Sequence, residues 1–115
     1  MISENSVREI LSQYKRFGWR LERVLLTPDL KKSLGESIAT LFENGSVAES
    51  DLDAAWFSRP AVNGRTAWEL RSLTNTPFAL LNSSEPEADE SRLAEIFSCV
   101  EDQMRERLIR PPRTH

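Results

Sequence analysis

Residues 53–83 read DAAWFSRPAVNGRTAWELRSLTNTPFALLNS, and this stretch decides the fold that the sequence predicts. It predicts three strands, over 53–59, 65–73 and from 77 or 78 to 82. The Asn63-Gly64 pair favours a tight turn between the first two strands, because both residue types tolerate a left-handed backbone. Pro77 ends the second connection. Three consecutive strands joined by short turns predict an antiparallel meander.

The residues before this segment predict a helix and a further strand. Apolar residues at helical spacing indicate a helix over 3–17, which ends before Gly18. Alternation of side chains then predicts a strand over 19–27.

A second helix is expected to begin at Thr27-Pro28-Asp29, which combines an N-cap residue, a proline at the first helical position and an acid in the first turn. Gly35 interrupts the helical pattern, and Asn44-Gly45 ends it. Residues 46–52 fit either a helix start or a loop. We interpret them as a loop that leads into the strand over 53–59.

The last helix is predicted by a stripe of apolar residues at helical spacing, formed by Leu93, Ile96, Phe97, Val100, Met104 and Leu108. Its start is placed at Ser84, with Glu87 three residues later as in a capping box. Pro111-Pro112 ends the helix. We therefore expect a single domain over 1–110 and a disordered tail over 111–115.

The predicted order of elements is α-β-α-β-β-β-α. Antiparallel sheets usually keep one face in water and cover the other. We therefore expect an α+β fold, a two-layer sandwich in which helices pack on one face of an antiparallel sheet of about four strands.

Composition fits one globular domain that buries a core of its own, with 115 residues of which 39% are hydrophobic and 29% charged. The formal net charge of −3 argues against a general nucleic-acid binder. The N-terminus has no apolar run of the kind that a signal peptide needs, and no window is apolar enough to span a membrane. The expected location is the cytoplasm, with no nucleic acid and no membrane as partner.

Little in the sequence indicates catalysis. His115, the only histidine, is the final residue, which argues against histidine acid-base work and Ser-His-Asp machinery. Cys99, the only cysteine, neighbours the apolar stripe and is expected to be a buried, inert thiol. We expect no catalytic residue, no cofactor and no metal site.

Two arrangements of acidic residues could in principle bind a cation or act in catalysis. Glu49, Asp51 and Asp53 alternate as in a cation-binding loop, but the glycine and final glutamate of a calcium loop are missing, which favours a solvated loop. Asp53 and Glu69 are the residue types of a glycosidase carboxylate pair, but nothing in the sequence fixes their separation.

The remaining candidate site is the meander itself, which mixes aromatic residues and arginine, both enriched where proteins bind partners. The candidate binding residues are Trp56, Arg59, Asn63, Arg65, Trp68, Glu69 and Arg71. In the other interpretation the two tryptophans are core residues, and the charged side chains form cross-strand ion pairs on a wet face.

The leading functional hypothesis is a small cytoplasmic interaction protein without catalysis, which binds a protein partner or itself, as a homodimer, through the face or edge of the sheet. The alternative is a small-ligand-binding domain, or an enzyme that uses carboxylate and arginine only, with a pocket between sheet and helices. A third hypothesis is that the acidic run 85–90 presents carboxylates to a basic partner.

Overall fold

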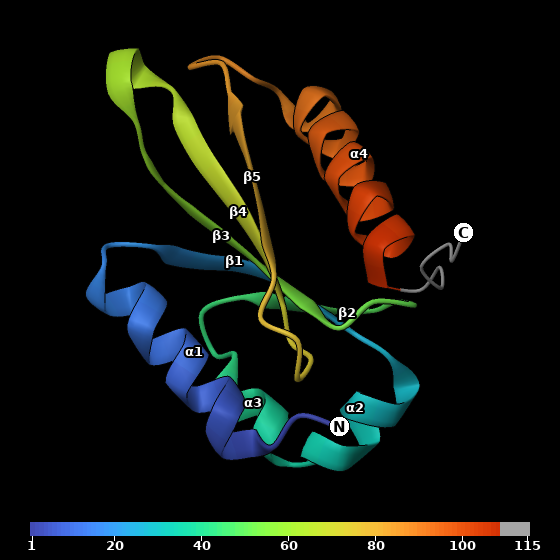
Figure 1. The fold of residues 1–115 in the computed structure, drawn as a ribbon. Coiled ribbons are helices and arrows are strands. Elements are labelled where there is room, and N and C mark those ends of the chain that lie inside the picture. The colour runs from blue at the N-terminus through green and yellow to red at the C-terminus, as the bar shows by residue number, and fades with distance from the viewer. Residues whose placement is uncertain (109–115) are drawn as a thin grey trace.

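The computed structural model describes residues 1–108 and has an α+β fold, in which a five-stranded sheet lies between two layers of helices (Figure 1). The order of strands is β2-β1-β3-β4-β5. The elements are α1 (Glu4–Arg16), β1 (Arg20–Leu26), α2 (Pro28–Leu34), α3 (Ser37–Leu41), β2 (Ser46–Glu49), β3 (Ala54–Pro60), the 3-10 turn η1 (Val62–Gly64), β4 (Thr66–Ser72), β5 (Ala79–Ser84) and α4 (Glu90–Leu108). The predicted tail over 111–115 lies outside the described residues.

The α+β class and the meander are confirmed. β3, β4 and β5 pair antiparallel in sequence order, and β1 pairs antiparallel with the other side of β3. The sheet also contains β2, where a loop was predicted; β2 pairs parallel with β1, so the sheet is mixed. Its four residues lie at an edge and are mostly exposed, so they show no burial pattern that a sequence could reveal.

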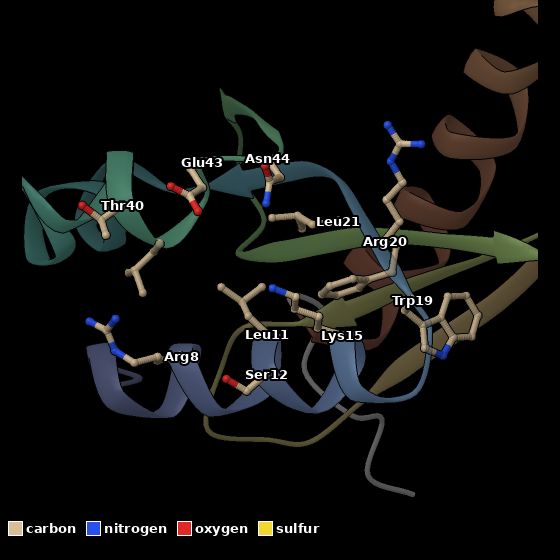
Figure 2. A pocket seen from close by; sticks show the side chains of 12 residues that line it. Arg8, Leu11, Ser12, Lys15, Trp19, Arg20, Leu21, Thr40, Glu43 and Asn44 are labelled. Carbon is tan, nitrogen blue, oxygen red and sulfur yellow. The ribbon is translucent and has the colours of Figure 1, made fainter.

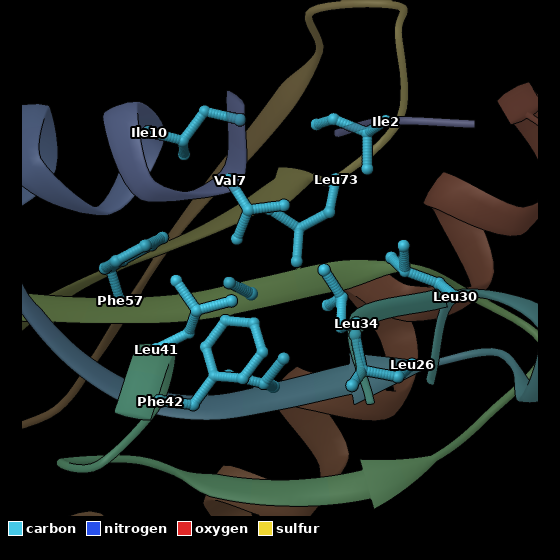
Figure 3. Close-up of a cluster of buried hydrophobic side chains, with 12 residues drawn as sticks. Ile2, Val7, Ile10, Leu26, Leu30, Leu34, Leu41, Phe42, Phe57 and Leu73 are labelled. Atoms are coloured by element: carbon cyan, nitrogen blue, oxygen red, sulfur yellow. The ribbon is translucent and has the colours of Figure 1, made fainter. Parts of the chain in front are cut away.

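Helices α1, α2 and α3 cover one face of the sheet, and Figure 3 shows their shared cluster of apolar side chains. The sheet contributes Val24, Leu26, Ala55, Phe57 and Leu73 to this cluster. The predicted second helix is divided at Gly35, whose φ of +53° ends α2. A left-handed backbone costs glycine little, so α2 and α3 form a bent pair over the sheet.

Helix α4 covers the opposite face, so the predicted arrangement with helices on one face only is wrong. Its apolar stripe packs on Leu25, Ala54, Trp56, Trp68 and Leu70. The reason lies in β3, where Ala54, Ala55, Trp56 and Phe57 are all buried and no polar side chain alternates with them. A strand that is apolar on both sides needs a layer on each face.

Helix α4 also begins later than predicted. Ser84 is the last residue of β5 and is buried, and the helix starts at Glu90. Asp89 caps it, since its Oδ1 accepts a hydrogen bond of 2.8 Å from the backbone N–H of Arg92. The segment between Ser84 and Asp89 is therefore a connection between β5 and α4.

Replacing Met104 tests the second layer. Met104 is fully buried beneath α4, so Met104→Ala should lower the free energy of unfolding by about 2–5 kcal/mol through lost burial and the cavity left behind. Ser98→Ala, on the exposed side of the same helix, should change it by less than about 0.5 kcal/mol. Urea unfolding followed by circular dichroism measures both. Equal stability of the two variants would contradict the packing of α4 on the sheet.

Candidate functional site

The two candidate tryptophans are core residues. Trp56 and Trp68 are 0% and 7% exposed and pack around Phe97 of α4, with ring centroids 4.7 and 4.9 Å away. The indole N–H of Trp56 donates to a carboxylate oxygen of Glu101 at 2.8 Å, and that of Trp68 donates to Ser84 Oγ at 3.0 Å. Neither ring is presented to a partner.

Arg59 and Asn63 lie at the far end of the β3–β4 hairpin. The Arg59 side chain donates to the carbonyl of Phe17 at 3.2 Å and lies over the ring of Trp19, 4.8 Å from its centroid. Asn63 is exposed in η1 with a φ of +58°. Asparagine tolerates this left-handed backbone better than most residues, so Asn63 shapes the turn.

Arg65 and Arg71 are half-buried and have partners within the chain. Arg65 donates to Ser83 Oγ at 3.0 Å, and Arg71 donates to the carbonyl of Ser72. Arg65 and Arg71 alternate with Trp68 along the chain, so they lie on the face of the sheet opposite the one that α4 covers. The structure therefore does not bring the predicted binding residues together in one site.

Glu69 accepts a hydrogen bond from the hydroxyl of Tyr14, which ties β4 to α1. The Tyr14 ring stacks on Phe57 with a centroid distance of 4.0 Å. Burial raises the pKa of Tyr14, and the neighbouring Glu69 carboxylate raises it further, while Arg71 opposes the shift. Burial and this contact therefore keep the phenol protonated.

The suggested pair of Asp53 and Glu69 does not form. Asp53 accepts hydrogen bonds from the backbone N–H and the hydroxyl of Thr27, at 2.6 and 3.1 Å, and so holds the start of α2. Glu69 of β4 lies opposite Phe57 of β3, and Phe57 is four residues after Asp53 in the chain. The two carboxylates therefore serve different elements.

A groove of about 700 Å³ opens between α1, α3 and the first residues of β1. Figure 2 shows Leu11 and Lys15 pointing from α1 toward Leu21, with Glu43 and Asn44 across the opening. The lining residues are Arg8, Leu11, Ser12, Lys15, Trp19, Arg20, Leu21, Thr40, Leu41, Glu43, Asn44 and Phe57. The lining thus combines five apolar residues with seven polar ones, of which three are cations and one is an acid.

Arg8 pairs with Glu4 of its own helix at 2.7 Å, whereas the side chains of Lys15 and Arg20 form no hydrogen bond or ion pair within residues 1–108. Arg20 pairs with Ser58 in the sheet, and Figure 2 shows its side chain pointing away from Lys15. Sequence reasoning missed these residues because it searched the meander. The spacing of Arg8, Ser12 and Lys15 places these three residues on one side of α1. This spacing could have indicated the α1 wall of the groove.

The outer edge of β5 is a second open surface. In an antiparallel pair, residues alternate between those that bond to the neighbouring strand and those that face away. The backbone N–H of Ser72 donates to the carbonyl of Phe78. The backbone N–H and C=O groups of Phe78, Leu80 and Asn82 therefore point toward β4. The backbone groups of Ala79, Leu81 and Ser83 consequently point outward. Leu81 is 68% exposed.

Cys99 and Asp51 were also singled out by the sequence. Cys99 is an exposed free thiol, so its predicted burial is wrong; it lies about 100° around the helix from the buried Val100. Asp51 is held by Arg105 at 2.8 Å, which lowers the pKa of the Asp51 carboxyl. Within residues 1–108 no group of three or more His, Cys, Asp or Glu side chains is placed to hold a metal ion.

Comparison of the chain with protein-family models, curated proteins and solved structures gives no match. Among the described helices, none has the length and apolar character needed to cross a membrane.

Tyr14 is the only tyrosine, so its ionisation can be followed by ultraviolet absorbance of tyrosinate. Its pKa is raised in the folded protein, so the associated stability is fully present below the unfolded value of about 10 and is lost as pH rises through the folded value. We expect no tyrosinate signal at pH 10 while circular dichroism reports a folded chain. In Glu69→Gln the pKa should fall toward its ordinary value. A full tyrosinate step at pH 10 in the folded wild type would contradict the contact.

Proposed function

We propose that the protein is a non-catalytic interaction protein of the cytoplasm that binds by strand addition at the outer edge of β5, and that the strand it binds is β5 of a second copy. The observation that carries this proposal is the exposed Leu81 on an edge without protection. An exposed free thiol at Cys99 is compatible with a reducing compartment.

The chemistry of β5 favours pairing. Natural edge strands are usually blunted by charges, proline or short length. The six residues of β5, Ala-Leu-Leu-Asn-Ser-Ser, include no charge and no proline. The other edge strand, β2, has only four residues and ends in Glu49. Of the two edges, β5 is therefore the better template for another strand.

A second copy fits this edge in antiparallel register. Leu81 of one copy would exchange backbone hydrogen bonds with Leu81 of the other across a two-fold axis, and Ala79 would oppose Ser83. The two exposed Leu81 side chains would then lie side by side on one face of a continuous sheet. The pairing covers the most exposed apolar residue of the sheet strands.

Charge supports the antiparallel direction. Arg107 lies over Phe78, 5.2 Å from the ring centroid, and places a cation at the start of β5. Glu85, which already pairs with Arg92 at 3.1 Å, and Glu87 follow the end of β5. Antiparallel pairing brings the basic start of one strand beside the acidic end of the other, whereas parallel pairing would bring like charges together.

Asn82 limits the strength of the pairing. Its side-chain oxygen accepts a hydrogen bond of 2.7 Å from the backbone N–H of Ser83, one of the groups that point outward. A second strand must displace this bond. The buried interface is also small, so we expect a weak dimer with a dissociation constant of about 1–100 μM.

Leu81→Lys tests the proposal, because it places two like charges opposite each other at the two-fold axis and should weaken the dimer about tenfold or more. Val62→Lys is the matched control, since Val62 is 76% exposed but lies in η1, away from β5. Sedimentation velocity over a range of concentrations measures the mass of each variant.

Asn82→Ala should act in the opposite direction and tighten the dimer a few-fold, because it frees the N–H of Ser83. A spin label on Cys99, the only cysteine, gives an independent readout as a distance between two copies. A wild-type chain that stays monomeric at high micromolar concentration would refute self-pairing and direct the search to a strand from another protein.

A further inference from the structure

We infer that the turn between α1 and β1 is a docking surface for an acidic segment of another protein, with Phe17 as its apolar anchor. Among the aromatic residues within 1–108, Phe17 alone is exposed, at 67%. The surface goes beyond the proposed function, because β3 and β4 lie between β1 and β5 and because it needs no second copy.

The backbone of the turn holds Phe17 in a fixed position. The backbone N–H of Trp19 donates to the carbonyl of Tyr14 at 2.9 Å, and Gly18 between them has a φ of +84°, which other residues rarely adopt. The side chain of Arg59 donates to the carbonyl of Phe17 at 3.2 Å and so ties the turn to β3. An anchor that is already held in place loses little conformational freedom when it binds.

Two arginines lie beside this anchor. Arg16 precedes Phe17 in the chain and is exposed in the last turn of α1. Arg59 is also exposed, and besides its bond to the turn it lies over the ring of Trp19, 4.8 Å from the centroid. Neither arginine has an ion-pair partner within residues 1–108. A carboxylate that approaches them therefore gains charge-assisted hydrogen bonds without breaking an existing ion pair.

The chain around the turn lacks acidic residues, although the whole chain has a formal net charge of −3. Residues 10–21, which include the end of α1 and the start of β1, contain no Asp or Glu, and neither do residues 54–68 of the adjoining hairpin. Glu69, on the same face of the sheet, already accepts the hydrogen bond of Tyr14. The surface is therefore a local basic region that complements an acidic partner.

The aromatic rings favour a protein segment over a nucleic acid. Single-stranded nucleic acids bind where successive bases stack on several aromatic rings. The ring of Trp19 already carries Arg59 and contacts the edge of Tyr14 at 6.1 Å, which leaves Phe17 to be covered. A single apolar anchor flanked by arginine is typical of a protein interface, and arginine pairs with carboxylates in a bidentate manner.

Selection of peptides from a random display library on the immobilised chain tests the inference. Peptides that bind wild type but not Phe17→Ser depend on this surface, and we expect them to be rich in Asp and Glu. Fluorescence anisotropy then measures one such peptide against matched variants. Arg16→Glu should weaken its binding about tenfold, because a charge beside the anchor is reversed. Lys32→Glu makes the same change in the last turn of α2 and should leave affinity within about twofold.

Three results would overturn the inference: no peptide that depends on Phe17, dependent peptides without acidic enrichment, or equal weakening by Arg16→Glu and Lys32→Glu. Displacement of the peptide by oligothymidylate at the same concentration would also overturn it, in favour of a nucleic acid. Leu81→Ser removes an apolar side chain of matched exposure, 68%, from the proposed β5 pairing and should bind the peptide like wild type. Failure of the dimer and failure of the turn are therefore distinguishable.

Discussion

The structure depends on the burial of β3 from both sides. Every residue from Ala54 to Ser58 is buried, and β3 lies at the centre of the sheet, between β1 and β4. Because side chains alternate across a strand, Trp56 requires a layer on one face and Phe57 requires a layer on the other. Helix α4 satisfies the first requirement, and α1 to α3 satisfy the second. The three-layer arrangement follows from one short apolar sequence.

Polar atoms within these layers form hydrogen bonds with side chains of neighbouring elements. These bonds involve Trp56, Trp68 and Glu69, which the sequence suggested as binding residues. Trp56 bonds Glu101 of α4, Trp68 bonds Ser84 of β5, and Tyr14 of α1 bonds Glu69 of β4. Among the described residues, no buried side-chain nitrogen or oxygen lacks a hydrogen-bond partner. An unpaired buried donor would cost about 1–3 kcal/mol, so each bond fixes how a layer or strand sits on its neighbour.

The elements that could be predicted are those with strong local signals. The turn residues Asn63-Gly64 and Pro77 predicted the meander. The long stripe of apolar residues predicted α4. The side of the sheet that α4 covers, and the strand β2, depend on contacts far apart in sequence. The burial of Trp56 and Trp68 could not be predicted for the same reason: tryptophan and arginine are enriched at interfaces, but composition does not say which face of a strand is covered. Lys15 and Leu21 come to line one groove only when α1 folds back on β1.

Covering both faces of the sheet also limits where the protein can bind anything. What remains is an edge, a gap between helices and the turn between α1 and β1. The more open edge is β5, because β2 is short and ends in an acid. The side-chain oxygen of Asn82 accepts a hydrogen bond from one outward N–H of β5. The gap is the groove above the start of β1, lined by residues of α1 and α3. Two strands, β3 and β4, separate β1 from β5 in the sheet, so occupancy of one surface does not obstruct the other.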